Sequence, residues 1–342
     1  MRQIRNEKFV NLAQIVDNFF KFKRICVNKF SFIDLFAGVG GFAFALSDRG
    51  GDCVYSSEID ENACKTYALN HNITPFGDIT KDEIQSKIPK NFDILCGGFP
   101  CQAFSIAGYQ KGFDDTRGTL FFEIEKITKK HLPKVLFLEN VKNLKSHDKG
   151  RTFCVIKNSL ENLNYAVFDA VLNSATHANI PQNRERIFIV AFNKNLVKNY
   201  NKFEFPKQIP LTKTIHNILL KEKQDDKFYY TPKNCYFYEN LETNLTNFDT
   251  IYQWRRVYLR ENKNNLCPTL TANMGTGGHN VPIIKDKFGF RKLTPLECFR
   301  FQGYENIKLP NITNSQLYKQ AGNSVTMPLI KRITDEILKV IK

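Results

Sequence analysis

The sequence predicts an α/β protein in which a mixed, mostly parallel sheet is followed by a smaller, irregular domain that contains β-strands. Short apolar runs alternate with helical patterns from residue 32 to about residue 203, as expected where helices cross between parallel strands. From residue 204 to residue 290 this alternation stops, and Asn, Lys, Tyr and Phe are frequent. We therefore place a first domain at residues 30–203 and a second domain with its hinge at residues 204–311.

The composition indicates a globular protein with a polyanionic partner. Hydrophobic residues make up 42% of the 342 residues, and the formal net charge is +15. No long apolar span or basic amphipathic anchor accompanies this charge, so nucleic acid is favoured over a membrane; a lysine-rich solvated surface is the alternative. The nine cysteines have no paired Cys-x-x-Cys spacing, and no secretory signal is found in the sequence. We therefore expect reduced thiols in the cytoplasm, without a disulfide framework or a metal site.

Residues 1–29 form a basic extension ahead of the first domain. Its apolar residues have the spacing of one face of a short helix, and Lys21, Lys23 and Arg24 follow them. This helix either packs on the main domain or contacts a partner or the DNA backbone.

The first strand, near Phe32, runs into a glycine-rich turn at Gly38, Gly40 and Gly41. Glycines allow a ligand to approach the backbone closely, and the helix that follows offers free N–H groups. A second strand, at residues 52–57, ends in Glu58, at the spacing where a carboxylate reaches ribose hydroxyls. The Gly-x-Gly-Gly pattern departs from the dinucleotide fingerprint and favours another adenosine-bearing ligand.

A second acidic residue follows the next helix. Asp60 can cap a helix from Glu61 to about Asn70, and a short strand is expected to lead into Gly77-Asp78. Asp78 suits an adenine amino group, although a cap for the segment after Thr80 is an equal alternative.

A cysteine stands at the end of the next strand. The apolar run at residues 92–96 predicts a buried strand, and Gly97-Gly98-Phe99-Pro100-Cys101-Gln102 follows it. Ligand chemistry in such sheets gathers beyond the carboxyl ends of strands, but a buried core thiol is the alternative for Cys101. Residues 103–119 have little periodicity and predict a mobile active-site loop.

Later strands bring a carboxyl group and two arginines. After a helix at residues 120–131, the strand at residues 135–138 ends at Glu139, and we expect this strand to adjoin that of Cys101. A helix at residues 152–163 and a strand at residues 165–172 continue the alternation. Arg184 and Arg186 directly precede the strand at residues 187–191; they indicate ligand binding or an ion pair with Glu185.

The second domain contains a dense set of groups suited to DNA. Arg255 and Arg256 lie within residues 252–260, and Thr269 and Thr271 within residues 268–280, where donors for base edges and phosphates are frequent. A core hairpin with a polar loop is the alternative. Residues 291–304 predict a turn and helix that pack the two domains together, and residues 320–325 are expected to open the last helix, at residues 327–341.

Taken together, these residues resemble the DNA (cytosine-5) methyltransferase family of the bacterial restriction–modification type. The ordered motifs span residues 32–330 and are Asp34 to Phe42, Gly98 to Gln102, Glu139 to Val141, Gln182 to Arg186, Arg291 to Pro295, and Gln320 to Val325. The resemblance implies a Rossmann-like S-adenosylmethionine-dependent methyltransferase domain that residues 312–342 complete. It also implies that the smaller domain is a target-recognition domain forming the other wall of a DNA cleft.

The resemblance also implies roles for individual residues. The cofactor S-adenosylmethionine would be bound by Phe36, Gly38, Gly40, Gly41, Glu58, Ile59, Asp78, Ile79, Pro100, Asn323 and Ser324. The candidates for contacts with double-stranded DNA are Gln102, Ser105, Gln182, Arg255, Arg256, Thr269 and Thr271.

The expected reaction is methylation of carbon 5 of a flipped-out cytosine within a short specific duplex. The Cys101 thiolate would add to carbon 6, a protonated Glu139 would act at N3, and Arg186 would grip the cytosine carbonyl or a phosphate, with Arg184 ordering Glu139 or the backbone. We expect a monomeric modification enzyme that functions with a restriction endonuclease. The alternatives are a tRNA cytosine-5 methyltransferase and a non-catalytic DNA-binding regulator.

Overall fold

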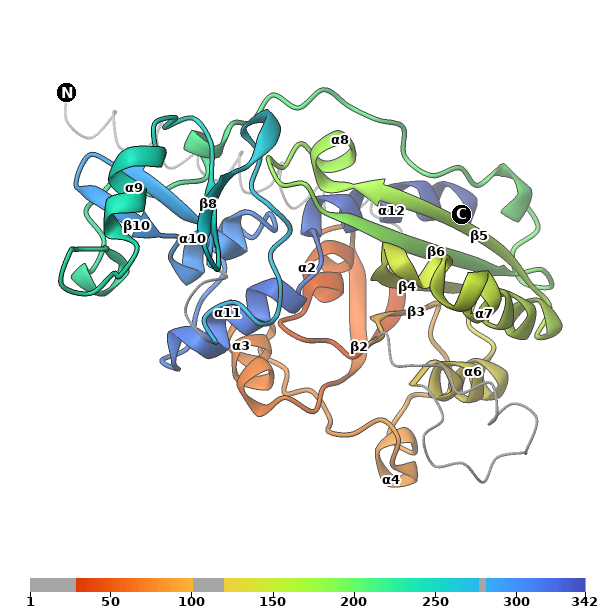
Figure 1. Cartoon of the computed structure of the whole chain (residues 1–342). Coiled ribbons are helices and arrows are strands. Elements are labelled where there is room, and N and C mark those ends of the chain that lie inside the picture. The colour runs from red at the N-terminus through yellow and green to blue at the C-terminus, as the bar shows by residue number, and fades with distance from the viewer. Residues whose placement is uncertain (1–28, 101–119, 277–280, 342) are drawn as a thin grey trace, which may run out of the picture.

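The computed structural model describes residues 29–100, 120–276 and 281–341. Within these residues the chain forms two sheets, with strand orders β2-β1-β3-β4-β6-β5 and β10-β9-β7-β8 (Figure 1). The larger sheet and its helices form one part of the molecule, and the smaller sheet forms the other, with helix α11 between them (Figure 1).

The larger sheet is mixed and mostly parallel, as the sequence predicts. Its strands are β1 (Phe30–Leu35), β2 (Gly51–Ser57), β3 (Ile94–Gly98), β4 (Val135–Val141), β5 (Tyr165–Asn173) and β6 (Glu185–Asn193). Strands β2, β1, β3 and β4 run parallel, whereas β6 runs antiparallel to both β4 and β5. The central strands are continuous apolar runs because helices cover both of their faces.

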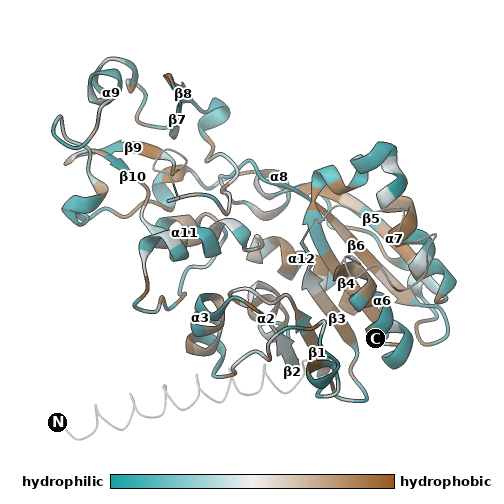
Figure 2. Cartoon of the chain, turned by 60° about the horizontal axis from the view of Figure 1, so that its bottom comes forward, coloured by the Kyte–Doolittle hydropathy of each residue, from teal (hydrophilic) through white to brown (hydrophobic). Residues whose placement is uncertain are grey.

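Helices cover the two faces of this sheet and enclose two hydrophobic cores. The helices of this part are α2 (Gly41–Ser47), α3 (Glu61–His71), α4 (Asp82–Gln85), α6 (Leu120–His131), α7 (Arg151–Asn162), α8 (Ser174–Ala178) and α12 (Met327–Val340). Helices α2 and α12 contribute to the core on one face, and α6 and α7 to the core on the other. Figure 2 shows the hydrophobic strands lying beneath these helices.

The parallel strands bring their carboxyl ends to one edge of the sheet. Leu35 pairs with both Ser57 and Gly97, and Gly98 pairs with Glu139. The residues that follow β1, β2 and β3 therefore lie close to the end of β4. The prediction that the strand of Glu139 adjoins the strand that leads to Cys101 is confirmed.

The smaller sheet is antiparallel and has its own core. Its strands are β7 (Tyr252–Arg255), β8 (Tyr258–Glu261), β9 (Ile283–Asp286) and β10 (Gly289–Lys292), and helices α9 (Tyr238–Asn244) and α10 (Pro295–Arg300) belong to the same part. Trp254 stacks on Phe237 with ring centroids 4.2 Å apart. Helix α10 begins with a capping box in which Thr294 and Glu297 satisfy each other's backbone N–H groups.

Helix α11 (Asn314–Asn323) connects the two parts. Tyr318 belongs to the core of the smaller part, while Gln320 bonds to Thr66 of α3. The expectation that residues 320–325 open the last helix is therefore wrong: Gln320 lies in α11, and the extended backbone of Ser324 separates α11 from α12. Helix α12 packs on α2 in the larger part.

The connections differ from expectation at one further place. No strand forms before Gly77 within the described residues, and Phe76 makes just an isolated bridge to Ser57. Single-turn 3₁₀ helices occupy other connections, at Lys142–Lys145 (η1), His147–Gly150 (η2), Tyr200–Lys202 (η3), Ile215–Asn217 (η4), Asp226–Phe228 (η5) and Lys263–Asn265 (η6).

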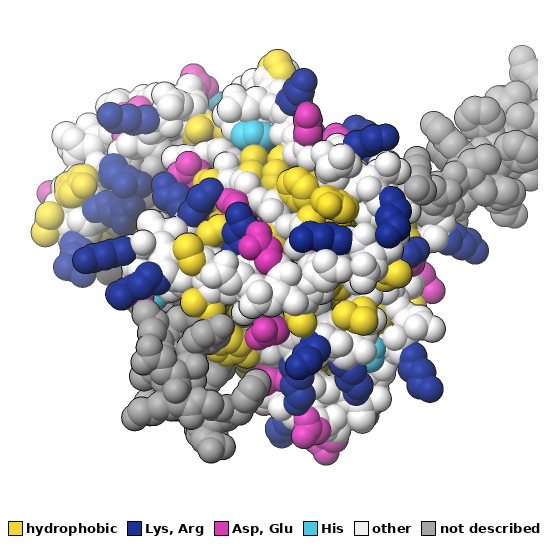
Figure 3. Space-filling model, turned by 90° about the vertical axis from the view of Figure 1, so that its right-hand side faces the viewer, with side chains coloured by type: hydrophobic (Ala, Val, Ile, Leu, Met, Phe, Trp, Pro, Cys, Tyr) yellow, Lys and Arg dark blue, Asp and Glu magenta, His cyan; other side chains and the backbone are white. Residues whose placement is uncertain are grey.

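One face of the molecule carries both grouped and scattered positive charge. In Figure 3, several Lys and Arg side chains lie together at the left, and others are scattered among acidic side chains. Across the described ranges, no helix has both the length and the apolar character needed to cross a membrane.

Candidate active site

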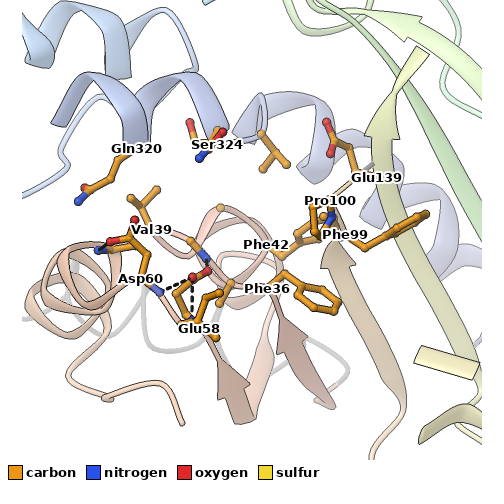
Figure 4. Close-up of a pocket in the computed structure, with 18 of the residues that line it drawn as sticks. Phe36, Val39, Phe42, Glu58, Asp60, Phe99, Pro100, Glu139, Gln320 and Ser324 are labelled. Carbon is orange, nitrogen blue, oxygen red and sulfur yellow. Dashed lines mark hydrogen bonds between the residues drawn. The ribbon is translucent and has the colours of Figure 1, made fainter. Parts of the chain in front are cut away.

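A cavity of about 520 Å³ lies at the carboxyl edge of the larger sheet. Its walls come from the β1–α2 turn, the ends of β2, β3 and β4, the start of β6, the segment at residues 77–79, and α11. Figure 4 shows Glu58 near the middle of the cavity, with Glu139 and Pro100 toward one end and Asp60 and Gln320 toward the other.

The glycine-rich turn is held by the carboxylate of Glu58. This carboxylate accepts hydrogen bonds from the backbone N–H groups of Gly38 at 2.7 Å, and of Ile59 and Asp60 at 2.8 Å (Figure 4). Gly40 has a φ of 85°, and a Cβ there would lie 2.2 Å from Nε2 of His71. Glycine is therefore required at position 40, and the turn is fixed against Glu58.

Phe36, Asp78 and Ile79 line the cavity beside this turn, as the sequence predicts for a nucleoside site. Oδ1 of Asp78 accepts hydrogen bonds from the N–H and the hydroxyl of Thr80, and these bonds lower the pKa of Asp78. Asp78 is thus a carboxylate at neutral pH, able to accept a bond from an amino group. Ile59 also lines the cavity, at its rim, with 71% of its surface exposed.

Glu139 is the buried carboxyl group of the site. It is 8% exposed, and Nε of Arg186 lies 3.1 Å from its Oε1. Burial raises the pKa of Glu139, while the charges of Arg186 and Arg184 oppose that rise. The environment therefore favours a carboxyl that holds a proton at higher pH than an exposed glutamate does.

Asn140 has a positioning role that the sequence did not reveal. Its Nδ2 donates to the carbonyl of Phe99 at 2.8 Å, and its Oδ1 accepts from the N–H of Val141. The side chain thereby ties the end of β4 to the backbone just before Pro100. The position of Asn140 in the Glu-Asn-Val motif was the one sequence signal for this role, but the motif alone does not show which group the Asn140 side chain contacts.

Arg184 is buried and links its own segment to two other backbone segments. Its guanidinium donates to the carbonyls of Leu270 at 2.8 Å, Gly322 at 3.1 Å and Ser324 at 2.7 Å. Burial lowers the pKa of Arg184 to about 9, so the group stays protonated at neutral pH. Of the roles expected for Arg184, the ordering of the backbone is the one these contacts support.

Gln182 has a different role from the DNA contact expected of it. It is fully buried, and its Nε2 donates to the carbonyl of Phe301 at 2.6 Å, while its Oε1 accepts from the N–H of Leu270. Both ends of the amide are used inside the protein. We therefore reassign Gln182 as a residue that joins the two parts of the chain.

Of the remaining DNA candidates in the smaller part, Arg255, Arg256 and Thr271 are exposed and Thr269 is partly exposed. Arg255 and Arg256 lie at the β7–β8 turn, where Arg256 has a φ of 61°. The hydroxyl of Thr269 donates to the carbonyl of Asn183 at 2.6 Å, and that of Thr271 donates to Asn273. Each of the four side chains is accessible to a partner.

The other expected site residues divide into two groups. Gly38, Gly41, Pro100, Asn323 and Ser324 line the cavity. Cys101, Gln102 and Ser105 lie outside the described residues, as does the extension at residues 1–28. Pro100, the sequence neighbour of Cys101, is thus the nearest described residue to the expected nucleophile.

The cavity residues fit a nucleoside with a charged tail. Ser57, Gln320 and Arg184 line the cavity, and each has one buried side-chain atom without a hydrogen-bond partner among the described residues: Oγ, Nε2 and Nε, respectively. Such atoms are costly unless a ligand satisfies them. Together with the aromatic ring of Phe36 and the carboxylate of Asp78, they offer the polar and stacking groups that S-adenosylmethionine needs.

Comparisons with known proteins agree with this chemistry. The family model for C-5 cytosine-specific DNA methylase matches residues 30–339. The chain is 52% identical over 310 residues to type II methyltransferase M.Bsp6I of Bacillus sp. (strain RFL6), covering 89% of this chain and 97% of that protein. It is 40% identical over 332 residues to type II methyltransferase M.HpaII of Haemophilus parainfluenzae, covering 91% and 90% of the two chains.

A solved structure shows the shared fold. The crystal structure of S. pombe Dnmt2 methyltransferase matches with a TM-score of 0.65 and 19% identity, covering 90% of this chain and 98% of that one. The sequence motifs, the cavity and the family match lead to one conclusion: the chain belongs to the C-5 cytosine-specific DNA methylase family.

Proposed function

We propose a residue-level mechanism for the reaction of this enzyme, the transfer of a methyl group from S-adenosylmethionine to carbon 5 of cytosine in DNA. Cys101 is the nucleophile, Glu139 the proton donor, and Arg186 the group that holds the cytosine. The observation that carries the proposal is the buried pair of Glu139 and Arg186, which lines the same cavity as Glu58 and Pro100.

The cofactor residues are assigned by the chemistry of the cavity. Phe36, Glu58, Asp78, Asn323 and Ser324 all line the cavity. Phe36 would stack on the adenine, Asp78 would accept a bond from the adenine amino group and Glu58 would hold the ribose, with Asn323 and Ser324 completing the pocket. When bound, S-adenosylmethionine supplies an electrophilic methyl group on a sulfonium centre. The glycine-rich turn brings backbone N–H groups close to the ligand without interference from a Cβ.

The chain's own groups make carbon 5 reactive. The thiolate of Cys101 forms a bond to carbon 6 while Glu139 passes its proton to N3, which leaves carbon 5 electron-rich. After carbon 5 carries the methyl group, its proton leaves to water, the electrons of that bond form the double bond between carbons 5 and 6, and the bond between Sγ and carbon 6 breaks, which restores the thiolate. Glu139 then takes its proton back from N3, which leaves neutral 5-methylcytosine.

Arg186 orients this acid and the cytosine. Its Nε lies against Glu139, and its Nη1 donates to the carbonyl of Glu185 at 2.8 Å, so its side chain is held from two sides. Arg186 lines the cavity, and its remaining donors suit the cytosine carbonyl. Arg184 is a positioning residue, because both of its terminal nitrogens donate to backbone carbonyls of other segments.

The target base must leave the duplex to enter this cavity. Unstacking and unpairing cost a few kcal/mol, which contacts to the rest of the duplex offset. We assign these contacts to Arg255, Arg256, Thr269 and Thr271 on the smaller part, and to Gln102 and Ser105. The relatives named type II methyltransferases support a role as the modification enzyme of a restriction–modification system, paired with a restriction endonuclease.

The covalent step is tested with a trapped adduct. Sequencing of methylated DNA from cells that express the protein identifies the target cytosine. A duplex with 5-fluorocytosine at that position then traps the adduct, because fluorine cannot leave carbon 5 as the proton does. The wild-type protein and Cys154→Ser, which changes an exposed thiol on α7, are expected to form a stable adduct with this duplex, and Cys101→Ser is expected to form none. An adduct with Cys101→Ser, or none with the wild type, contradicts the mechanism.

A further inference from the structure

We propose that the larger sheet carries a second DNA-binding surface, at the edge opposite the cavity, which binds the phosphates of a second duplex segment. The cavity lies at the carboxyl ends of the parallel strands, and this surface lies at their amino ends. It consists of residues 89–93, 129–134 and 193–199, which we call the amino edge. These segments precede β3, precede β4 and follow β6, respectively.

Hydrogen bonds and close contacts join the three segments of the amino edge. The carbonyl of Asp93 accepts the first N–H of β4 at 3.0 Å, and the carbonyl of Lys134 accepts the N–H of Asn193 at 2.9 Å. Nδ1 of His131 lies 3.4 Å from the carbonyl oxygen of Lys90. The three segments therefore form one continuous surface.

The amino edge is strongly positive. It contains six lysines and one acidic residue, Asp93, whereas the whole chain has 49 basic and 34 acidic residues. Lys134 pairs with Asp93 at 2.7 Å. Four other lysines of the edge form no ion pair within the described ranges, namely Lys90, Lys130, Lys194 and Lys198. Like charges so close together repel each other, and a polyanion would offset that repulsion.

The basic extension joins the chain at the same edge. Residues 1–28 contain six basic and two acidic residues, and Lys29 directly precedes β1. The N–H of Ser31 donates to the carboxylate of Asp93 at 2.8 Å, so the start of β1 lies against the amino edge. The charge of the extension is therefore covalently tethered beside the six lysines.

The side chains of the amino edge suit DNA phosphates better than a protein partner. Lys and Asn are frequent donors to phosphates and sugars, and Asn91, Asn195 and Asn199 are exposed between the lysines. Protein interfaces are instead depleted in Lys and have an apolar centre, whereas Leu132 and Leu196 are the exposed large apolar residues here. Because the substrate is a long polymer, another segment of the same DNA is present at high local concentration.

A duplex in the cleft leaves the amino edge free. Strand β4 has seven residues and runs from this edge to the cavity. At about 3.3 Å per residue, its length separates the two edges by roughly 20 Å. The amino edge is thus available to a second segment while the first is being methylated.

A solvated, lysine-rich surface is the competing explanation. Lys129 and Lys130 lie in the last turn of α6, where a positive charge also stabilises the helix dipole. That role does not apply to Lys90 or Lys194, which lie outside helices. If the lysines serve solubility alone, DNA binding will depend on the number of charges removed and not on their position.

The experiment fills the cleft first and then adds a second duplex. The full chain is trapped on its target duplex with 5-fluorocytosine, and a short fluorescein-labelled duplex without the target is titrated in by fluorescence anisotropy. The wild-type complex should bind it with a Kd of about 10⁻⁶–10⁻⁴ M at physiological salt, typical of non-specific binding. A variant that combines Lys90→Gln, Lys130→Gln and Lys194→Gln should bind it at least about tenfold more weakly, with a salt slope smaller by roughly 3. Its rate of methylation of a short target duplex should remain that of the wild type.

A matched variant removes three lysines from the smaller part. Lys213→Gln, Lys223→Gln and Lys227→Gln, combined in one chain, remove lysines that pair with acidic residues at 3.1, 2.8 and 3.0 Å. The change in net charge is the same as in the amino-edge variant. This control should bind the second duplex as tightly as the wild type does.

A competitor distinguishes DNA from an acidic protein. Polyglutamate carries one charge per residue, about 3.3 Å of extended chain, whereas duplex DNA carries one charge per roughly 1.7 Å. At equal total charge, unlabelled duplex should therefore displace the labelled duplex far better than polyglutamate does. Equal displacement would favour an acidic protein partner and overturn the assignment to DNA.

The remaining outcomes are equally decisive. The proposal is overturned if the trapped wild-type complex binds no second duplex, or if the amino-edge variant binds it as tightly as the matched variant. Failure to form the trapped complex would instead contradict the covalent mechanism. Sedimentation of the free chain with short duplexes then tests the amino edge alone, with two duplexes per chain expected for the wild type and one for the amino-edge variant; equal stoichiometry would overturn the proposal.

Discussion

Substitution of Arg184 by lysine tests whether one buried guanidinium joins the two parts of this enzyme. The arginine donates to the carbonyls of Leu270, Gly322 and Ser324, which lie on two separate segments. Lysine keeps the positive charge but has a single nitrogen, which cannot occupy the positions of both terminal guanidinium nitrogens. A lysine nitrogen at the position of Nη2 keeps the bonds to Gly322 and Ser324, but it leaves the buried carbonyl of Leu270 without a donor.

The size of the effect follows from that one carbonyl. A buried acceptor left unsatisfied costs about 1–3 kcal/mol, so Arg184→Lys should lower the free energy of unfolding by roughly 1–3 kcal/mol. Against the 5–15 kcal/mol typical of a folded domain, this loss should appear as a fall in the urea midpoint. The bonded segments flank Thr269, Thr271 and Asn323, so affinity for both DNA and S-adenosylhomocysteine should fall in the variant.

Arg332→Lys is the matched control. Arg332 also donates to two backbone carbonyls, of His177 and Lys207, but it is partly exposed, so water can replace the lost bonds. Its free energy of unfolding should change by less than about 1 kcal/mol. If Arg184→Lys were as stable as this control, the hydrogen bonds of Arg184 to the three carbonyls would not stabilise the fold as we infer.

Other substitutions test the acid and the reassigned glutamine. Glu139→Gln should lower kcat by roughly 10²–10⁴-fold without changing affinity for S-adenosylhomocysteine. Because burial raises the pKa of Glu139, wild-type kcat should fall as the pH rises through that pKa and the proton is lost; the same fall in Glu139→Gln would contradict the assignment. Gln182→Leu should lower the free energy of unfolding by about 1–3 kcal/mol and leave the salt dependence of DNA binding unchanged. Arg256→Gln should reduce the slope of log Kd against log salt concentration by about 1. An unchanged slope in Arg256→Gln would refute the phosphate contact, and a reduced slope in Gln182→Leu would refute the structural role of Gln182.

Local patterns in the sequence were sufficient for much of the catalytic part. The run from Val135 to Leu138 predicts a strand because its four residues are apolar, and β4 contains it. The expected helix at residues 120–131 coincides with α6, and Asp60 caps α3 as expected. Each of these features depends on neighbours close in sequence, which is why the pattern alone identifies it.

The smaller part and the connections were harder to derive. Its strands have four residues each, too few for a clear alternation. Helix α11 was missed because its polar residues face the cavity and α3 as well as solvent, which obscures an amphipathic pattern. Residues 72–76 lack a strand because the chain makes one bridge to β2 at Phe76 and then turns into the cavity wall.

The sequence by itself determined that Glu58 and Glu139 lie at one edge of the sheet, because parallel strands joined by crossover helices must end together. Only the tertiary structure decided which of the polar residues near that edge are free for a ligand. Gln182 and Arg184 have the same polar character as Arg186, but partners 86 to 140 positions away in the chain enclose them. Burial and hydrogen bonding of this kind depend on segments that meet through folding, which local patterns do not record.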